Sequence, residues 1–301
     1  MATSGLLIVD KPRGWTSHDV VAKLRKLVGT KRVGHAGTLD PMATGVLVVG
    51  VEKATRLLGY LALTEKEYSA TIRLGQTTAT DDADGEIIDH VPVRNIGEAE
   101  LLRAIEPLTG QISQVPPGVS AIKVAGQRAY KLARGGAAPE LAARTVTVRE
   151  FALTGIRQAV GDVLDVDVRV TCSSGTYIRA LARDLGVGLG VGAHLTALRR
   201  TRVGPYLAGE ARTLDELAVG ADDADGLPVV PLAAAAAAAF PHRDLTEAEA
   251  RAVGHGARLL ATGTGEPPVA AFAPDGSLVA LLTDVGGEAR SLAVFASELA
   301  Y

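Results

Sequence analysis

The segment from Gly34 to Gly45 (GHAGTLDPMATG) constrains the fold of this chain most strongly. Its three glycines and one proline require the backbone to turn sharply or to let another group approach closely. An unbroken apolar run, Gly45–Val51, follows at once and predicts a buried strand. Asp40 therefore lies in a loop that leads directly into the core. Aspartate among glycines is most often a turn residue, but a carboxylate on such a loop, with His35 and Thr38 beside it, is also placed to meet a ligand.

Hydrophobic periodicity predicts the elements around this loop. They are a buried strand (6–9), a helix that Ser17 caps and Gly29 ends, half-buried strands (68–74 and 164–172), a short helix (98–106) and a helix (177–185). Arg179 and Arg183, four residues apart on the last helix, would share one of its faces. We expect a surface loop at the acidic stretch 77–85, which lacks the spacing of a calcium loop. The basic stretch 128–144 predicts a mobile insertion able to follow a nucleic-acid backbone.

The character of the sequence changes after Leu227. Pro228, Pro231 and a run of seven alanines, Ala233–Ala239, form a low-complexity bridge in which we expect a short helix. Strand patterns follow at 268–273, 277–282 and 291–295. The sequence therefore predicts two domains, residues 1–228 and a small, β-rich domain over 229–301.

The formal net charge of −3 conceals an uneven distribution. Residues 205–301 hold 14 acidic and 5 basic side chains, whereas the first 204 residues hold 20 acidic and 26 basic ones. Ordinary surface variation can give such an excess. Because local charge governs phosphate binding more than total charge does, the first part of the chain is nevertheless the better candidate for contacts with a nucleic acid.

Several classes of protein are excluded by composition and spacing. The lone Cys172 cannot form an internal disulfide or a thiolate zinc site, and the six histidines lack metal-ligand spacing. Val51 stands where a phosphate loop requires lysine, and Gly188–Gly190 follows a predicted helix rather than the strand that precedes a dinucleotide fingerprint. No apolar run is long enough to span a membrane and no secretory signal is visible, so we expect a cytoplasmic protein.

Six motifs follow one another along the first two thirds of the chain. They are DKPRGWTS (10–17), GHAGTLDPMATG (34–45), YSATIRLG (68–75), PP with SAIK and GQRAY (116–130), SGTYIR (174–179) and LRRT (198–201). With these motifs in this order, the chain resembles the bacterial tRNA pseudouridine synthases of the B type, which modify uridine 55 in the T-loop. Val119 departs from the pattern, because that family usually has tyrosine there, and an aromatic contact from this position loses its basis.

The resemblance implies a role for three residues in catalysis. Asp40 would be the nucleophile, attacking either the ribose C1′ or the uracil ring, and Arg179 would be the counter-charge that keeps it ionised. Tyr68 would stack on the target base and take part in proton transfer at the ring. From its pattern alone, Tyr68 is an ordinary core tyrosine, and only the resemblance gives it this role.

Four further residues are implied in substrate binding. Leu198 would line the apolar side of the pocket, and Tyr177 would be a further contact. The target nucleotide must be extruded from the T-loop, and His35 would fill the space that it leaves. Lys11 would be a structural support or a phosphate contact.

The fold implied by the resemblance is mixed α/β (α+β), with a largely antiparallel central sheet, flanking helices and a small C-terminal β-rich domain. That small domain resembles the RNA-binding domain shared by pseudouridine synthases and archaeosine transglycosylases. The isomerisation needs no cofactor or metal, and the expected partner is the T-arm of tRNA, with no membrane and with the protein as a monomer. The alternative is a tRNA-folding or RNA-binding protein without catalysis, against which the intact Asp40, Tyr68 and Arg179 argue.

Overall fold

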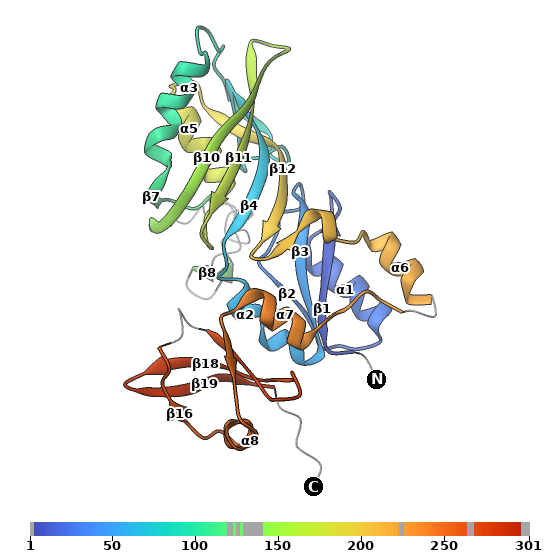
Figure 1. Ribbon diagram of the computed structural model, residues 1–301. Coiled ribbons are helices and arrows are strands. Elements are labelled where there is room, and N and C mark those ends of the chain that lie inside the picture. The colour runs from blue at the N-terminus through green and yellow to red at the C-terminus, as the bar shows by residue number, and fades with distance from the viewer. Residues whose placement is uncertain are drawn as a thin grey trace.

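The computed structural model describes residues 3–118, 123–124, 127–128, 141–222, 226–263 and 268–295. Within them, a ten-stranded sheet runs in the order β14-β1-β3-β12-β4-β11-β10-β7, with β13 paired to β12 and β2 to β3. A separate five-stranded sheet has the order β15-β17-β18-β19-β16. Figure 1 shows the large sheet as one long twisted layer with the small sheet below one of its ends. The expected two-part, mixed α/β architecture is confirmed.

The strands of the large sheet are β1 (Gly5–Lys11), β2 (Val33–Ala36), β3 (Thr44–Val51), β4 (Lys66–Leu74), β7 (Gly110–Gln114), β10 (Arg144–Ala159), β11 (Val163–Cys172), β12 (Ala193–Val203), β13 (Tyr206–Leu207) and β14 (Val230–Pro231). Two short hairpins stand apart: β5 (Gln76–Thr78) with β6 (Ile87–His90), and β8 (Lys123–Val124) with β9 (Gln127–Arg128). The small sheet holds β15 (His242–Asp244), β16 (Leu259–Leu260), β17 (Val269–Phe272), β18 (Leu278–Val285) and β19 (Glu288–Val294).

The helices are α1 (Ser17–Val28), α2 (Leu58–Leu61), α3 (Glu98–Ile105), α5 (Ile178–Gly188), α6 (Leu214–Asp222), α7 (Leu232–Ala239) and α8 (Glu247–Gly254), with short 3-10 turns at Glu52–Arg56, Glu106–Leu108 and Ala208–Glu210. In Figure 1, α3 and α5 lie beside the β10–β11 end of the large sheet, and α1 and α6 lie beside its β1–β3 end. The strands pair antiparallel throughout the large sheet except where β12 meets β3. The predicted largely antiparallel sheet is therefore present.

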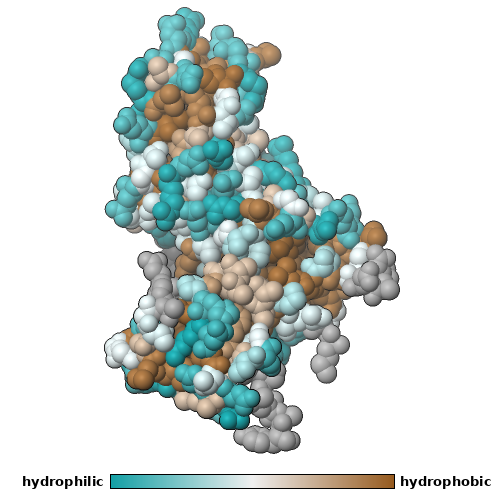
Figure 2. All heavy atoms as spheres, in the orientation of Figure 1, coloured by the Kyte–Doolittle hydropathy of each residue, from teal (hydrophilic) through white to brown (hydrophobic). Residues whose placement is uncertain are grey.

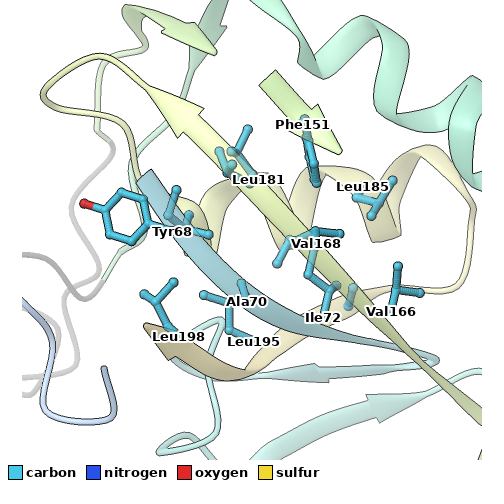
Figure 3. Packing of buried hydrophobic residues seen from close by; sticks show 14 of the residues in the cluster. Tyr68, Ala70, Ile72, Phe151, Val166, Val168, Leu181, Leu185, Leu195 and Leu198 are labelled. Carbon is cyan, nitrogen blue, oxygen red and sulfur yellow. The ribbon is translucent and has the colours of Figure 1, made fainter. Parts of the chain in front are cut away.

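Apolar side chains from both ends of the large sheet bury its faces. At one end, alternate residues of β4, β11 and β12 pack against Leu181 and Leu185 of α5 and against α3 (Figure 3). At the other end both faces of β1 and β3 are covered, which is why their sequences are continuously apolar rather than alternating. On the face shown in Figure 2, the remaining hydrophobic surface is divided into separate patches with hydrophilic residues around them.

The small sheet is fixed to the large one by a shared core and by hydrogen bonds. Phe240, Phe272 and Phe295 belong to the same buried cluster as Leu6 and Val48 of the large sheet. Three side chains near α2 also donate to backbone carbonyls at the end of β19 and just beyond it: Lys53 to Phe295, Arg56 to Val294 and Tyr60 to Leu292. The chain beyond residue 228 thus first joins the large sheet through β14 and α7, and the separate sheet begins at β15.

Two local predictions differ from the structure. The helix α1 is capped by Thr16, which accepts from the backbone N–H of Asp19 while the Asp19 carboxylate accepts from the Thr16 N–H. Ser17 is buried instead, and its hydroxyl bonds to both backbone groups of Leu39, because α1 packs beside the Asp40 loop. Residues 34–36 are not loop but part of strand β2, which pairs with β3, so the true loop spans only residues 37–43.

Gly45 makes the junction between β3 and β12 possible. Its φ of +98° lies in the region that favours glycine, and a Cβ there would stand 2.2 Å from the carbonyl oxygen of Arg200. Arg200 is its partner in the parallel pairing. The parallel pairing of β3 with β12 thus requires a residue without a side chain at position 45, two residues after the Asp40 loop.

We expect Gly45→Ala to lower the free energy of unfolding by about 2–4 kcal/mol, from backbone strain and the clash with Arg200. The matched control is Gly59→Ala in α2, where a Cβ meets no atom within 4 Å and the φ is ordinary. That variant should be unchanged or slightly stabilised, by at most about 1 kcal/mol. Urea unfolding of both proteins measures the difference, and equal stabilities would contradict this account of the junction.

His35 of β2 is held in its neutral form. Burial, aided by His18 whose ring lies edge-on 5.5 Å away and by Arg200, lowers the pKa of His35 to about 4. Its Nδ1 is buried without a hydrogen-bond partner among the described residues. Between pH 6.5 and 4 the unfolded chain therefore binds a proton at this residue that the folded chain does not bind.

Because the unfolded chain binds this proton more strongly, we predict that the free energy of unfolding falls as the pH drops from 7 to 5. His35→Asn should reduce this fall. The melting temperatures of the two proteins at pH 7 and pH 5 give the comparison. His255→Asn, at an exposed position, should leave the acid sensitivity as in the unsubstituted protein. A fall of the same size in all three proteins would mean that other groups control stability in this range.

Candidate active site

A cavity of about 270 Å³ opens where the two halves of the large sheet meet. It is lined by Gly37, Thr38, Leu39, Asp40, Ala62, Lys66, Tyr68, Ser173, Gly175, Thr176, Tyr177, Ile178, Arg179, Leu198 and Arg200. These residues come from the loop before β3, from the segment that runs from the end of α2 into β4, from β12, and from the turn before α5 with the first residues of that helix. The cavity therefore lies at the place where four segments distant in sequence converge. It contains five of the seven site residues predicted from the sequence.

An ion pair between Asp40 and Arg179 stands in this cavity. The Nε of Arg179 lies 2.9 Å from Oδ2 of Asp40. Arg179 is buried, whereas the Asp40 side chain keeps 36% of its surface exposed. The guanidinium therefore presents a fixed positive charge behind a carboxylate that a ligand can still reach. An opposite charge this close favours the ionised, nucleophilic form of a carboxylate.

The acidic stretch 77–85 completes the arrangement around Arg179. Asp82 is only 4% exposed, and its Oδ2 lies 3.5 Å from the Arg179 Nε. The carbonyl of Thr80 accepts from Nη1 of Arg179 at 2.7 Å. The prediction of a surface loop is right for Ala83 and Asp84, which are exposed, but wrong for Asp82, which turns inward toward the buried cation. The sequence did contain a signal for this contact. Asp81 and Asp82 are adjacent in the stretch, and the predicted helix carries Arg179 and Arg183 on one face.

Arg183 confirms that the two arginines share a face of α5. Its guanidinium lies 3.7 Å from Asp81 and 2.9 Å from Asp184, and it donates to the carbonyl of Val115. Burial, the largest effect, raises the pKa of Asp81 although both arginines oppose this. Arg183 thus binds the same stretch, 77–85, that Arg179 binds, from a position one turn further along α5.

Tyr68 and Leu198 form the apolar side of the cavity. Both are buried, on the neighbouring strands β4 and β12. Figure 3 shows the Tyr68 ring at the end of a row of packed side chains, with its hydroxyl pointing away from Val168 and Leu181. Burial raises the pKa of this phenol, so it remains a neutral hydrogen-bond donor over the physiological range. Tyr68 is therefore buried, as its pattern predicts, and also lines the cavity, as the resemblance implies.

Two buried cations that sequence analysis missed also line the cavity. Arg200 is 1% exposed and donates to the carbonyls of Val46 and Gly37. Lys66 donates to the carbonyls of Ala62 and Thr64, and burial, with Arg200 adding to the effect, lowers its pKa to about 8. Both side chains hold backbone segments at the rim of the cavity. Neither has a local pattern that distinguishes it from an exposed basic residue.

Lys11 and His35 do not line the cavity but lie behind its loop. Lys11 is fully buried, and its Nζ donates to the carbonyls of Pro12, Trp15 and Pro41. Burial lowers its pKa to about 8, although Asp40 works in the opposite direction. Of the two expectations for Lys11, the geometry supports the structural one. His35 lies on β2, two residues before the first residue of the loop that carries Asp40.

Tyr177 lines the cavity and is fixed through its backbone. It caps α5, and the side-chain amide of Gln114 accepts from its N–H at 2.8 Å and donates to its carbonyl at 3.1 Å. Gln114 ends β7 and is 2% exposed. This pair of bonds holds the start of α5, and therefore Arg179 in its first turn, against the sheet.

Some predictions fall on residues outside the described ones. They include Val119, most of the central motif between 116 and 130, and nearly all of the insertion at 128–144. In the part of the chain that the structure describes, no helix is both long and apolar enough to cross a bilayer.

Family models cover most of the chain. The N-terminal domain of the TruB family pseudouridylate synthases matches residues 25–178. A tRNA pseudouridylate synthase B C-terminal domain matches residues 179–225, and the C-terminal domain of tRNA pseudouridine synthase II matches residues 240–296.

Curated relatives and solved structures agree with these models. A tRNA pseudouridine synthase B of Thermobifida fusca (strain YX) is 62% identical over 295 residues, covering 97% of this chain and 98% of that protein. One from Arthrobacter sp. (strain FB24) is 57% identical over 302 residues and covers 97% of both.

Among solved structures, a chain of an H/ACA ribonucleoprotein bound to a substrate RNA containing 2'-deoxyuridine superposes with a TM-score of 0.74 at 28% identity, over 98% of this chain and 86% of that one. A chain of a Cbf5–Nop10–Gar1 complex gives 0.74 at 29% identity, over 97% and 84%. From the family models and from relatives that match nearly its full length, this chain belongs to the TruB family of pseudouridylate synthases.

Proposed function

We propose that this protein converts uridine 55 in the T-loop of tRNA to pseudouridine, with Asp40 as the nucleophile. The observation that carries the proposal is the ion pair between Asp40 and the buried Arg179 in the mouth of a nucleoside-sized cavity. The names of the relatives, tRNA pseudouridine synthase B, support the tRNA as substrate. The choice of uridine 55 rests on the resemblance of the six motifs.

The chemistry is an isomerisation that balances within the nucleotide. The bond between N1 and C1′ breaks, the uracil turns in the cavity, and a bond between C5 and C1′ forms. The C5 proton leaves and N1 gains a proton, so no oxidant, reductant or energy source is consumed. A nucleophile that holds one fragment while the other turns is therefore sufficient, whether Asp40 attacks C1′ or the uracil ring.

The surrounding residues prepare Asp40 for this role. Arg179 favours the ionised carboxylate and is itself held by Asp82 and the Thr80 carbonyl, so it cannot turn away toward solvent. Tyr68 and Leu198 provide an apolar wall against which the uracil ring can stack. The neutral Tyr68 hydroxyl is placed to exchange a hydrogen bond or proton at the ring.

Access requires the target nucleotide to leave the folded T-loop, at a cost of a few kcal/mol. His35, neutral and only partly exposed, is the proposed occupant of the space that the nucleotide leaves. Lys11 acts as a positioning residue, because its ammonium joins the carbonyl of Pro41, directly after Asp40, to those of Pro12 and Trp15.

The first test is Asp40→Asn, which keeps the shape of the side chain but cannot attack carbon. We expect pseudouridine formation to fall below a few per cent of the unsubstituted rate, while affinity for tRNA stays within several-fold. Tritium release from C5-labelled uridine in a tRNA transcript measures the rate, and a transcript with cytidine at position 55 controls for the site.

Asp84→Asn is the matched control, since Asp84 is an exposed carboxylate on the neighbouring turn, and it should retain the full rate. Residual turnover in Asp40→Asn well above a few per cent would remove Asp40 from the role of nucleophile. An unsubstituted protein that binds tRNA tightly but releases no tritium would favour the alternative of an RNA-binding protein without catalysis.

A second test separates the two effects of Arg179. Arg179→Gln leaves the buried Asp82 without a counter-charge, and removing one partner of a buried pair costs about 3–5 kcal/mol of unfolding free energy. Adding Asp82→Asn should restore much of that stability, because the uncompensated charge is gone. Catalysis should stay low in both variants, since Asp40 still lacks its cation.

Urea unfolding and single-turnover rates on the same preparations give both readouts. Arg183→Gln, one turn further along the same helix, is the control and should keep most of the rate. A double variant that regains activity together with stability would make Arg179 a purely structural residue.

A further inference from the structure

The only tryptophan of this chain lies at the surface beside the Asp40 loop. Aromatic residues make up 4% of the sequence, and Trp15 is the single tryptophan. It keeps 37% of its surface exposed, although tryptophan is highly buried on average in folded proteins. A large aromatic surface left open beside a candidate RNA site has the properties of a stacking platform rather than of a core residue.

The backbone that carries Trp15 is fixed to the loop that carries Asp40. The Lys11 ammonium donates to the carbonyls of both Trp15 and Pro41, at 2.7 and 3.3 Å. The N–H of Gly14 donates to the same Pro41 carbonyl at 2.8 Å. The carbonyl of Trp15 and that of Pro41, the residue after Asp40, thus accept from the same ammonium. The backbone position of Trp15 is therefore tied to that of Asp40.

The rest of this turn is also built to present a side chain outward. Gly14 has a φ of +84°, a backbone conformation that favours glycine. A Cβ there would meet no atom within 4 Å, so the turn needs glycine because of this φ and not because a side chain would clash. The cap of α1 at Thr16 fixes the other end. The tryptophan thus sits on a rigid support, which reduces the entropy lost when a ligand orders it.

The groups next to Trp15 indicate the chemistry of its partner. Arg13, two residues before it in the sequence, and His18, three residues after it, are both exposed. No carboxylate within the described ranges lies at ion-pair distance from Arg13, unlike most arginines of β10, β11 and β12. An exposed aromatic ring with a cation and an imidazole close to it in the sequence is a combination that can bind unstacked nucleotides, through base stacking and phosphate contacts.

We infer that Trp15 stacks on a nucleobase that neighbours the target uridine in the RNA substrate. The inference rests on the proposed function, because it requires the uridine to be bound at Asp40. When that uridine is extruded, the adjacent base loses its stacking partner, and Trp15 offers a replacement surface beside the loop that carries Asp40.

Because Trp15 is the only tryptophan, its fluorescence reports on this position alone. Asp40→Asn protein, which should bind without turnover, is titrated with a T-arm hairpin that carries a dye for anisotropy. We expect quenching that follows the binding curve. A set of hairpins with a single abasic nucleotide beside the target should identify one position at which binding continues but quenching is lost. Quenching that no abasic position removes would overturn the stacking.

Two variants test the energetic contribution. Trp15→Leu should weaken hairpin binding about 5- to 100-fold while leaving the rate at saturating RNA nearly unchanged, whereas Trp15→Phe should retain most of the affinity. Val160→Ala, at a fully exposed apolar position on the β10–β11 turn, is the control for loss of apolar surface and should bind normally.

The outcomes separate this inference from the proposed function. Tight binding and turnover with neither quenching nor an effect of Trp15→Leu would overturn the stacking role alone, and would leave Trp15 as a contact for another protein. A hairpin and a full tRNA that both fail to bind would overturn the proposed function, and the inference with it.

Discussion

The site of this protein depends on a single guanidinium, that of Arg179. It contacts the carboxylates of Asp40 and Asp82 and the carbonyl of Thr80, which belong to two turns from separate parts of the chain. A buried cation without partners would be strongly unfavourable, so these groups must gather around it when the chain folds. The same requirement that makes Arg179 compatible with a protein interior also places the Asp40 carboxylate at the mouth of the cavity.

Buried cations recur around this centre in a second role. Lys11, Lys66 and Arg200 each donate to two or more backbone carbonyls and leave hardly any surface exposed. Except for that of Val46 in β3, these carbonyls lie outside the strands and helices, and a side-chain donor satisfies them inside the protein. The lowered pKa values of Lys11 and Lys66, both about 8, reflect the desolvation that accompanies this arrangement. The loops of the site are thus held by side-chain hydrogen bonds although they lack regular structure.

Resemblance and periodicity predicted different parts of this arrangement. The motifs placed Asp40, Tyr68, Arg179, Tyr177 and Leu198 in one site, and these five line a common cavity. They did not indicate that Lys11 would face inward to three carbonyls or that Asp82 would turn toward Arg179. The sequence predicts Ser17 rather than Thr16 as the N-cap of α1, because a serine bonded to a distant loop looks the same in sequence as a capping serine.

The sequence by itself determined the elements, because hydrophobic alternation and helical spacing express which face of a segment is buried. It determined in this way β4, β11, α1, α5 and three strands of the small sheet, β17, β18 and β19, whereas the short β15 and β16 were not predicted. Tertiary structure alone decided the parallel contact of β12 with β3, the inward turn of the stretch 77–85 and the neighbourhood of Trp15 and Asp40. The Arg179–Thr80 bond joins residues 99 positions apart. Such pairings depend on the fold as a whole, since the sequence around a charged side chain or a carbonyl has no periodic pattern that identifies its partner.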